Sequence, residues 1–230
     1  SANLGYLWKE LPLPEAIHAA KNAGFEAVEC HEPYQYPAEE VYEALKETGL
    51  EMLGLNTRRG EPNLGERGLA AVPGRETDAR NIIDEAIEYG VVGIHCKNIH
   101  VIAGKTQRTP DAEETFQKNL TYAAQKASNH GKTILIEPLN LLDNPGYHLS
   151  TLDEALVTLE AVNHPSLKIM FDCYHLQIMH GNLLQRLQKH LPKIGHIQFA
   201  NAPGRTEPDK GEINFPWLFT EIDRIGWNGF

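Results

Sequence analysis

Cysteine is scarce in this sequence. The 230 residues contain three cysteines, Cys30, Cys96 and Cys173, and they are far apart. Each falls in or beside a stretch that has the apolar pattern of a strand, where a free cysteine behaves as a small hydrophobic residue. The pattern favours buried thiols over a disulfide framework and predicts a reducing compartment.

Long apolar runs are also missing. No run reaches the 18 residues that a membrane-spanning helix needs. The opening residues, SANLGYLW, lack the basic region, apolar core and cleavage site of a secretory signal. We therefore expect a soluble cytoplasmic protein with no membrane partner.

Positive charge is in short supply. Lysine and arginine total 21 against 31 aspartate and glutamate residues, so the formal net charge is −10. Broad binding to a phosphate backbone needs clustered basic residues. The composition thus disfavours nucleic acid as a partner, favours a small-molecule substrate, and leaves a homo-oligomer open.

Several common catalytic motifs are absent. The sequence has no HExxH and no GxSxG. The stretch AGKT at 103–106 resembles the end of a phosphate loop, but Ile99 stands where the loop needs its first glycine. His95, Cys96 and His100 lie within one expected strand whose side chains alternate between faces, and no second pair completes a zinc site. Structural roles are favoured for these three residues.

What the sequence does contain is a repeated alternation of short apolar runs and longer helical patterns. Strands are predicted at residues 1–4, 26–31, 50–55, 93–103, 132–138, 167–172 and 194–200. Helices are predicted at residues 14–23, 38–48, 75–90, 111–130, 151–163, 177–190 and 215–225.

Seven such units without a linker predict a single α/β domain over residues 1–230, a (β/α)8 TIM barrel. The eighth strand would begin where GWNGF stops, so we expect it to be truncated in this chain. A doubly wound open sheet is the alternative, because a strand count does not prove closure. Residues 56–73 show little periodicity, and a loop of this length is typical of a lid.

Three of the predicted strands carry oxygen-bearing side chains near their ends. Glu137 closes TILIE, Asp172 closes LKIMFD, and Gln198 lies within GHIQFA. The carboxyl ends of barrel strands form the active-site face, so these side chains should converge there. Two carboxylates and an amide suit Mg²⁺ or Mn²⁺. The competing interpretation is that both carboxylates pair with basic residues at the rim or cap the following segments.

Further candidates follow the last two of these strand ends. His175 lies three residues beyond Asp172, while Arg205 and Glu207 lie in the loop NAPGRTEPDKGEIN after Gln198. A guanidinium there could bind a substrate carboxylate bidentately. An exposed histidine and a solvated loop ion pair are the alternatives. The other arginines that could take this role surround the long loop: Arg58, Arg59, Arg67 and Arg75.

Longer phrases connect these residues to a known family. IEPLN, NPGYHL, FDCYHLQIMHGNL, KIGHIQFANAPGRTEPDKGEINF and GERGLAAVPGRE resemble the hydroxypyruvate isomerase family, within the xylose isomerase-like TIM barrels. The resemblance runs nearly from end to end, and the combination is more specific than any single phrase.

The resemblance implies an aldose–ketose type isomerase that interconverts hydroxypyruvate and 2-hydroxy-3-oxopropanoate (tartronate semialdehyde) through an enediolate. Glu137, Asp172 and Gln198 match the metal-binding positions, and Glu137 also matches one of two catalytic glutamates. His175 and Arg205 match substrate-side positions. The second glutamate of the family lies on the eighth strand, beyond GWNGF.

Other functions remain open at this point. An isomerase of four-carbon 2-oxo acids (2-oxo-tetronate) would use the same carboxylates. A ketose 3-epimerase is disfavoured because related epimerases generally carry histidine in place of Gln198. An abasic-site endonuclease with several zinc ions is disfavoured because no matching set of histidines is expected at the strand ends. A noncatalytic sugar-acid binding barrel is the alternative from another class.

Overall fold

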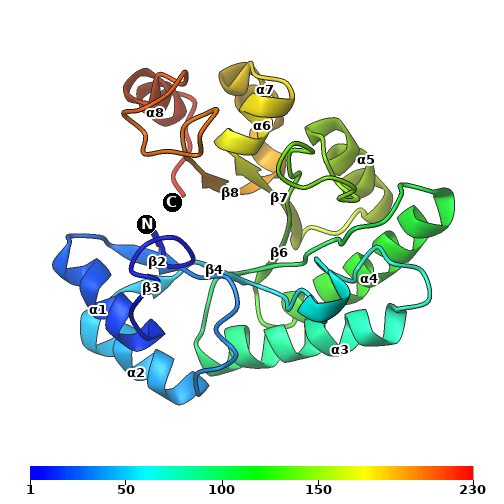
Figure 1. The fold of residues 1–230 in the computed structure, drawn as a ribbon, viewed down its shortest axis with the longest axis horizontal. Coiled ribbons are helices and arrows are strands. Elements are labelled where there is room, and N and C mark those ends of the chain that lie inside the picture. The colour runs from blue at the N-terminus through cyan, green and yellow to red at the C-terminus, as the bar shows by residue number, and fades with distance from the viewer. Residues whose placement is uncertain (230) are drawn as a thin grey trace.

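The computed structural model describes residues 1–229, in which short parallel strands form an inner arc and helices pack around its outside (Figure 1). The strands are β1 (Ala2–Asn3), β2 (Ala27–Glu29), β3 (Glu51–Met52), β4 (Gly54–Asn56), β5 (Asn98–His100), β6 (Thr133–Ile136), β7 (Leu167–Asp172) and β8 (Ile194–Gln198). Their order follows the sequence, β1-β2-β3 and then β4-β5-β6-β7-β8.

β3 and β4 are consecutive parts of the strand predicted at 50–55. Only Leu53 separates them. The N–H of Leu53 donates to the carbonyl of Val28, and the N–H of Cys30 donates to the carbonyl of Gly54. The pairing therefore continues across the break. The seven predicted strands are confirmed, and in residues 1–229 no strand stands between β8 and β1, as expected for a TIM barrel whose eighth strand is truncated.

The helices are α1 (Leu13–Asn22), α2 (Ala38–Thr48), α3 (Glu76–Ala86), α4 (Pro110–Ser128), α5 (Leu152–Val162), α6 (Cys173–Met179), α7 (Leu183–His190) and α8 (Phe215–Arg224). Local sequence explains their starts. Thr109 caps α4 with Pro110 in its first turn, and Thr151 forms a capping box with Glu154 at α5. No helix among the described residues is long and apolar enough to cross a membrane.

Two predictions of element boundaries were wrong. α3 continues as a π-helical stretch, Ile87–Gly93, so β5 begins at Asn98 rather than at 93. The helix predicted at 177–190 is two helices, because Gly181 and Asn182 both adopt positive φ, 63° and 54°, and interrupt the helical backbone. The first of the two, α6, also begins earlier than predicted, directly after the end of β7.

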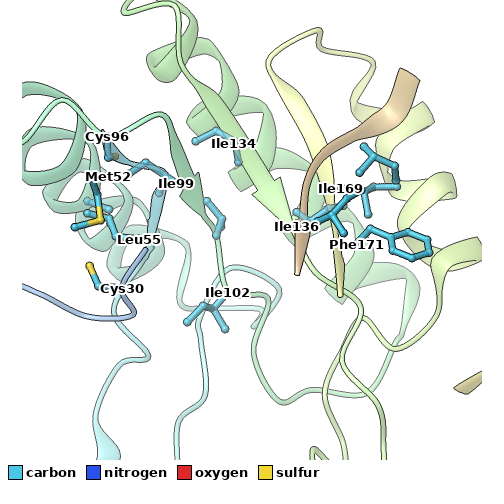
Figure 2. Close-up of a cluster of buried hydrophobic side chains, with 14 of the residues drawn as sticks. Cys30, Met52, Leu55, Cys96, Ile99, Ile102, Ile134, Ile136, Ile169 and Phe171 are labelled. Carbon is cyan, nitrogen blue, oxygen red and sulfur yellow. The ribbon is translucent and has the colours of Figure 1, made fainter. Parts of the chain in front are cut away.

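The core lies between the strands and the helices that surround them. Ile134 and Ile136 of β6 and Ile169 and Phe171 of β7 are fully buried (Figure 2). Such strands are buried on both faces, as is typical of parallel sheets covered by helices. The three cysteines are free and buried, as the sequence predicted.

A polar cluster ties α4 and α5 together behind the loop that leads from β6 to α5. Glu113 of α4 accepts hydrogen bonds from Thr158 of α5, at 2.7 Å, and contacts Nε2 of buried His148 at 3.2 Å. Burial alone would raise the pKa of Glu113, but these two hydrogen bonds help to lower the pKa to about 2. Glu113 is therefore ionised at neutral pH and holds the two helices together.

We expect Glu113→Gln to lower the free energy of unfolding at pH 7 by about 1–3 kcal/mol, because partly buried polar groups lose a charged partner. The folded-state pKa of Glu113 lies below its ordinary 4.5, so its contribution is present above pH 4.5 and is lost as the pH falls through about 2. Between these pH values the variant should lose less stability than the unchanged protein. Urea unfolding at a series of pH values measures both effects.

Glu114→Gln is the matched control. Glu114 is the next residue, and its side chain is 63% exposed in a pair with Lys118. Exposed pairs of this kind contribute little. Equal losses in the two variants would contradict a specific role for Glu113.

Candidate active site

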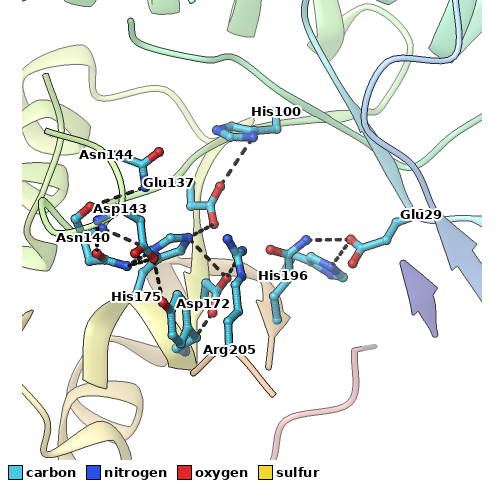
Figure 3. Close-up of polar contacts among 12 residues, drawn as sticks. Glu29, His100, Glu137, Asn140, Asp143, Asn144, Asp172, His175, His196 and Arg205 are labelled. Atoms are coloured by element: carbon cyan, nitrogen blue, oxygen red, sulfur yellow. Dashed lines mark hydrogen bonds and ion pairs between the residues drawn. The ribbon is translucent and has the colours of Figure 1, made fainter. Parts of the chain in front are cut away.

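The predicted strand-end residues meet at one end of the barrel. Glu137 directly follows β6, Asp172 is the last residue of β7, and Gln198 is the last residue of β8. Glu137 and Gln198 line a cavity of about 120 Å³. The carboxylate of Asp172 contacts Arg205, which also lines this cavity (Figure 3). One side-chain oxygen or nitrogen atom from each of Glu137, Asp172 and His175 lies within 4.8 Å of the other two.

The two carboxylates are deeply buried, with Glu137 7% and Asp172 3% exposed. Burial, together with the nearby charge of Asp172, raises the pKa of Glu137 well above its ordinary value. One cation partly offsets this repulsion, because Nη2 of Arg205 lies 3.3 Å from Oδ2 of Asp172. Asp172 Oδ1 also accepts a hydrogen bond from the backbone N–H of Tyr174, at 2.8 Å, and this contact caps the N-terminus of α6.

His175 is oriented by the backbone. Its Nδ1 accepts the N–H of Asn140 at 3.2 Å, so in the neutral ring the proton is on Nε2. Burial lowers the pKa of His175, which favours the neutral ring. Nε2 lies 3.8 Å from Asp172 Oδ2 and 4.0 Å from Glu137 Oε1. An Nε2–H group cannot coordinate a cation, so His175 is a hydrogen-bond donor facing the cavity.

The remaining oxygen of the set comes from Gln198. Its Nε2 donates to Oε2 of Glu29, at 2.9 Å, and the same oxygen is 2.8 Å from Nε2 of His196. Although burial raises the pKa of Glu29, the hydrogen bonds from His196 and Gln198 lower it, so Glu29 is ionised. Oε1 of Gln198 is then free to act as an acceptor.

These donors fit a divalent cation. Two carboxylates that repel each other while buried need positive charge, and an amide oxygen completes a set of hard oxygen ligands. The residues that would hold the ion are Glu137, Asp172 and Gln198. The structure therefore allows a metal site at the position that the sequence predicted.

Of the candidate arginines, Arg59, Arg67 and Arg205 line the cavity. Arg58 is bound to Glu85 at 2.7 Å, and Arg75 is paired with Glu66 and Asp78. The Arg205 side chain is held by two rings, with its guanidinium carbon 4.9 Å from the centre of Tyr6 and 5.0 Å from that of Tyr174.

Glu207 does not reach the cavity. Its side chain is 67% exposed and its carboxylate lies 3.5 Å from Lys210. The backbone explains the difference from Arg205, two residues earlier, because Arg205 has a positive φ of 52° and turns the chain there. Arg205 and Glu207, two residues apart in one loop, therefore lie in different surroundings, and the prediction that both face the substrate holds for the position of Arg205 alone.

The cavity also contains residues that the sequence analysis did not select. His31 follows β2, Asn56 ends β4 and His100 ends β5, and all three line the cavity. Among the described residues, the group that could hold a metal ion contains one histidine, His175, so the structure shows no set of histidines for several zinc ions. The sequence carried a signal for two of the three cavity residues, because His31 ends the stretch predicted as a strand at 26–31 and Asn56 directly follows the one at 50–55, whereas His100 lies inside the stretch predicted at 93–103. His95 packs against Tyr42 and does not join His100, so His95, Cys96 and His100 form no common site.

Burial keeps these two histidines neutral. It lowers the pKa of His31 to about 4 and, helped by the positive charge of nearby groups, that of His100 to about 3. Nδ1 of His100 lies 3.1 Å from Oδ1 of Asn56 and 3.7 Å from Glu137 Oε2. This wall of the cavity is therefore polar but carries no histidine charge at neutral pH.

A parallel barrel with buried carboxylates, an amide and neutral histidines around a small cavity at its strand ends defines a TIM-barrel enzyme for a small polar substrate. The chain belongs to the xylose isomerase-like TIM barrel family, whose model matches residues 17–230.

Known proteins agree with this assignment. The chain is 42% identical to a 2-oxo-tetronate isomerase of Cupriavidus necator and 38% identical to the hydroxypyruvate isomerase of Escherichia coli. Both alignments cover all of this chain, with 89% and 90% of the relative. A crystal structure from Brucella melitensis, described as an AP endonuclease of family 2, has 38% identity and a TM-score of 0.96 over all of this chain and 90% of the other. The prediction of an isomerase is confirmed by the curated relatives.

Proposed function

We propose that this protein interconverts hydroxypyruvate and 2-hydroxy-3-oxopropanoate (tartronate semialdehyde). The observation that carries the proposal is Glu137, a buried carboxylate with a raised pKa that faces a small cavity beside an Nε2–H donor and a guanidinium. Relatives over the full chain that carry the name hydroxypyruvate isomerase support the same reaction.

The size and charge of the cavity suit a three-carbon acid. Its volume of about 120 Å³ is well below the ~300–1,000 Å³ of sites for drug-sized ligands. Arg205 offers the substrate carboxylate a cation that the stacked rings of Tyr6 and Tyr174 hold in place. Arg59 and Arg67 remain the rival partners, since both line the cavity.

The chemistry requires one carbon-bound proton to move between neighbouring carbons. Glu137 removes a proton from C3 of hydroxypyruvate, which gives an enediolate, and a proton is returned to C2. The hydroxyl proton leaves O3 and O2 gains one, so no net proton is consumed. His175 donates its Nε2–H to a substrate oxygen and stabilises the negative charge that develops there.

A divalent cation, Mg²⁺ or Mn²⁺, would be held by Glu137, Asp172 and Gln198. When bound, it supplies a Lewis acid that polarises the substrate carbonyl and makes the neighbouring C–H more acidic. Residues 56–73 are our candidate lid: Gly68 pairs with Ala103, while Arg59 and Arg67 reach the cavity from this segment. Closure would exclude water from the enediolate.

An isomerase of 2-oxo-tetronate is the second candidate, supported by the relative at 42% identity. Proton transfer would involve the same two carbons, so the same residues would serve. DNA is a weaker candidate substrate, raised by the Brucella structure, because a net charge of −10 disfavours phosphate backbones. We also propose that the protein is cytoplasmic and that it acts without a membrane or nucleic-acid partner.

Removing one ligand should weaken cation binding. Asp172→Asn keeps an acceptor for the amide of Tyr174 but removes a charge, so Mn²⁺ affinity should fall by more than the ~10–100-fold typical of losing an outer partner. Isothermal titration with Mn²⁺ measures this. Glu207→Gln, which removes a carboxylate outside the cavity, should bind Mn²⁺ unchanged. Equal affinities in both variants would contradict the site.

Glu137→Gln should abolish isomerisation, because the amide cannot accept the carbon-bound proton. We expect a fall in kcat of roughly 100-fold or more, the contribution of general base catalysis. Proton NMR of hydroxypyruvate in D₂O with Mg²⁺ or Mn²⁺ follows aldehyde formation and deuterium uptake together.

Deuterium uptake in the same D₂O experiment compares 2-oxo-tetronate with hydroxypyruvate at equal enzyme concentration, since the four-carbon acid forms a ketone and no aldehyde. A higher kcat/KM for the four-carbon acid would select the second candidate. Near-normal turnover by the folded Glu137→Gln variant would remove Glu137 from the mechanism.

Arg205→Ala should raise KM about 10–100-fold, which corresponds to the ~1.5–3 kcal/mol of a hydrogen bond to a charged group. Steady-state kinetics measures it. Arg75→Ala is the matched control, because Arg75 is paired with Glu66 and Asp78 outside the cavity. If the KM of Arg205→Ala were unchanged, the carboxylate would be bound by Arg59 or Arg67 instead.

A further inference from the structure

Glu29 is a buried carboxylate that the mechanism above does not use. It lies on β2, is 7% exposed and reaches across the barrel interior to β8 (Figure 3). It contacts His196 and Gln198, which are 167 and 169 residues away in the sequence. A charged group in this position needs a reason, because burial of a carboxylate is costly unless its oxygens are hydrogen-bonded.

Its contacts are concentrated on one oxygen. Oε2 of Glu29 lies 2.8 Å from Nε2 of His196 and 2.9 Å from Nε2 of Gln198. A carboxylate accepts hydrogen bonds and cannot donate them. The side of the Gln198 amide that faces Glu29 must therefore be the NH₂ group.

An isolated glutamine has no such preference. Its NH₂ and carbonyl ends are nearly equal in size, so packing alone does not decide which end faces the cavity. An acceptor on one side decides it, because the reversed amide would bring its oxygen against the carboxylate oxygen. The hydrogen bond thus selects one of two nearly isosteric arrangements.

We propose that Glu29 is a positioning residue that turns Oε1 of Gln198 toward the cavity and so completes the oxygen ligands of the cation site. This inference rests on the proposed function, since it takes Gln198 as a ligand. His196 donates to the same oxygen of Glu29 and fixes where that oxygen lies. Neither Glu29 nor His196 lines the cavity.

The direct test is Mn²⁺ affinity by isothermal titration in two Glu29 variants. Glu29→Gln presents both an NH₂ group and an oxygen to Gln198 and removes the orientational choice. Glu29→Asp keeps the charge but withdraws the carboxylate by about 1.5 Å, one carbon–carbon bond. Each should weaken Mn²⁺ binding by about 10–100-fold, as is typical when a residue that orients a metal ligand is changed. Thermal unfolding confirms that both variants are folded.

A simple loss of negative charge would also weaken cation binding in Glu29→Gln, so the mechanism needs its own control. In the Gln198→Ala background there is no amide to orient, and adding Glu29→Gln should change Mn²⁺ affinity by less than about 2-fold. If Glu29 acted only through its charge, the two effects would instead add. Glu26→Gln removes an exposed carboxylate near the start of β2 and should leave affinity unchanged.

The outcomes separate this inference from the proposed reaction. Unchanged Mn²⁺ affinity in Glu29→Asp, or additive losses in the double variant, would overturn the positioning role while leaving the isomerase intact. Hydroxypyruvate turnover without any Mn²⁺ or Mg²⁺ uptake would also overturn it. Mn²⁺ uptake that depends on Glu29, in a protein that isomerises neither acid, would support the inference and remove the proposed function.

Discussion

The architecture of the active-site end depends on keeping two carboxylates together out of water. Glu137 and Asp172 are adjacent because β6 and β7 are parallel neighbours, and both are almost fully buried. Isolated, such a pair would not remain ionised. The chain therefore places Arg205 against Asp172, and the loop after β8 is built to hold it: Asn201 bonds to the carbonyls of Pro208 and Ile213 and closes the loop behind it.

A second layer of contacts decides which atoms face the cavity. The N–H of Asn140 places the proton of His175 on Nε2, and Glu29 directs the NH₂ of Gln198 away from the cavity. Each contact acts on a side chain with two nearly equivalent states, the two tautomers of His175 and the two amide orientations of Gln198. Both use an atom whose role is fixed, a backbone donor in one case and a carboxylate acceptor in the other. Asn140 and Glu29 therefore help to set the chemistry of the site, although neither residue lines the cavity.

The strand-end rule explains what could be predicted from the sequence. Glu137, Asp172 and Gln198 were predictable because a polar residue closing an apolar parallel strand lies on the active-site face. The same rule applied to the strand predicted at 26–31 would have found His31, whereas His100 lies inside the stretch predicted at 93–103, and only the structure shows that β5 ends there. Glu29 lies within a strand whose contacts come from the far end of the chain, so no local pattern reveals it. The division of residues 177–190 into two helices depends on the positive φ of Asn182, a conformation that asparagine adopts only in some contexts.

The two candidate substrates share the atoms at which the reaction occurs, a carboxylate, a carbonyl and the next carbon with its hydroxyl. Under the proposed mechanism Glu137 acts on that common part, so it does not discriminate between three and four carbons. Discrimination then falls to other residues that line the cavity, among them His31, Arg59 and Arg67. Arg59 is paired with Glu32 at 3.1 Å, and Arg67 lies on the same 56–73 segment. Under the proposed mechanism, the segment that excludes water from the reaction also determines how long a substrate the cavity accepts.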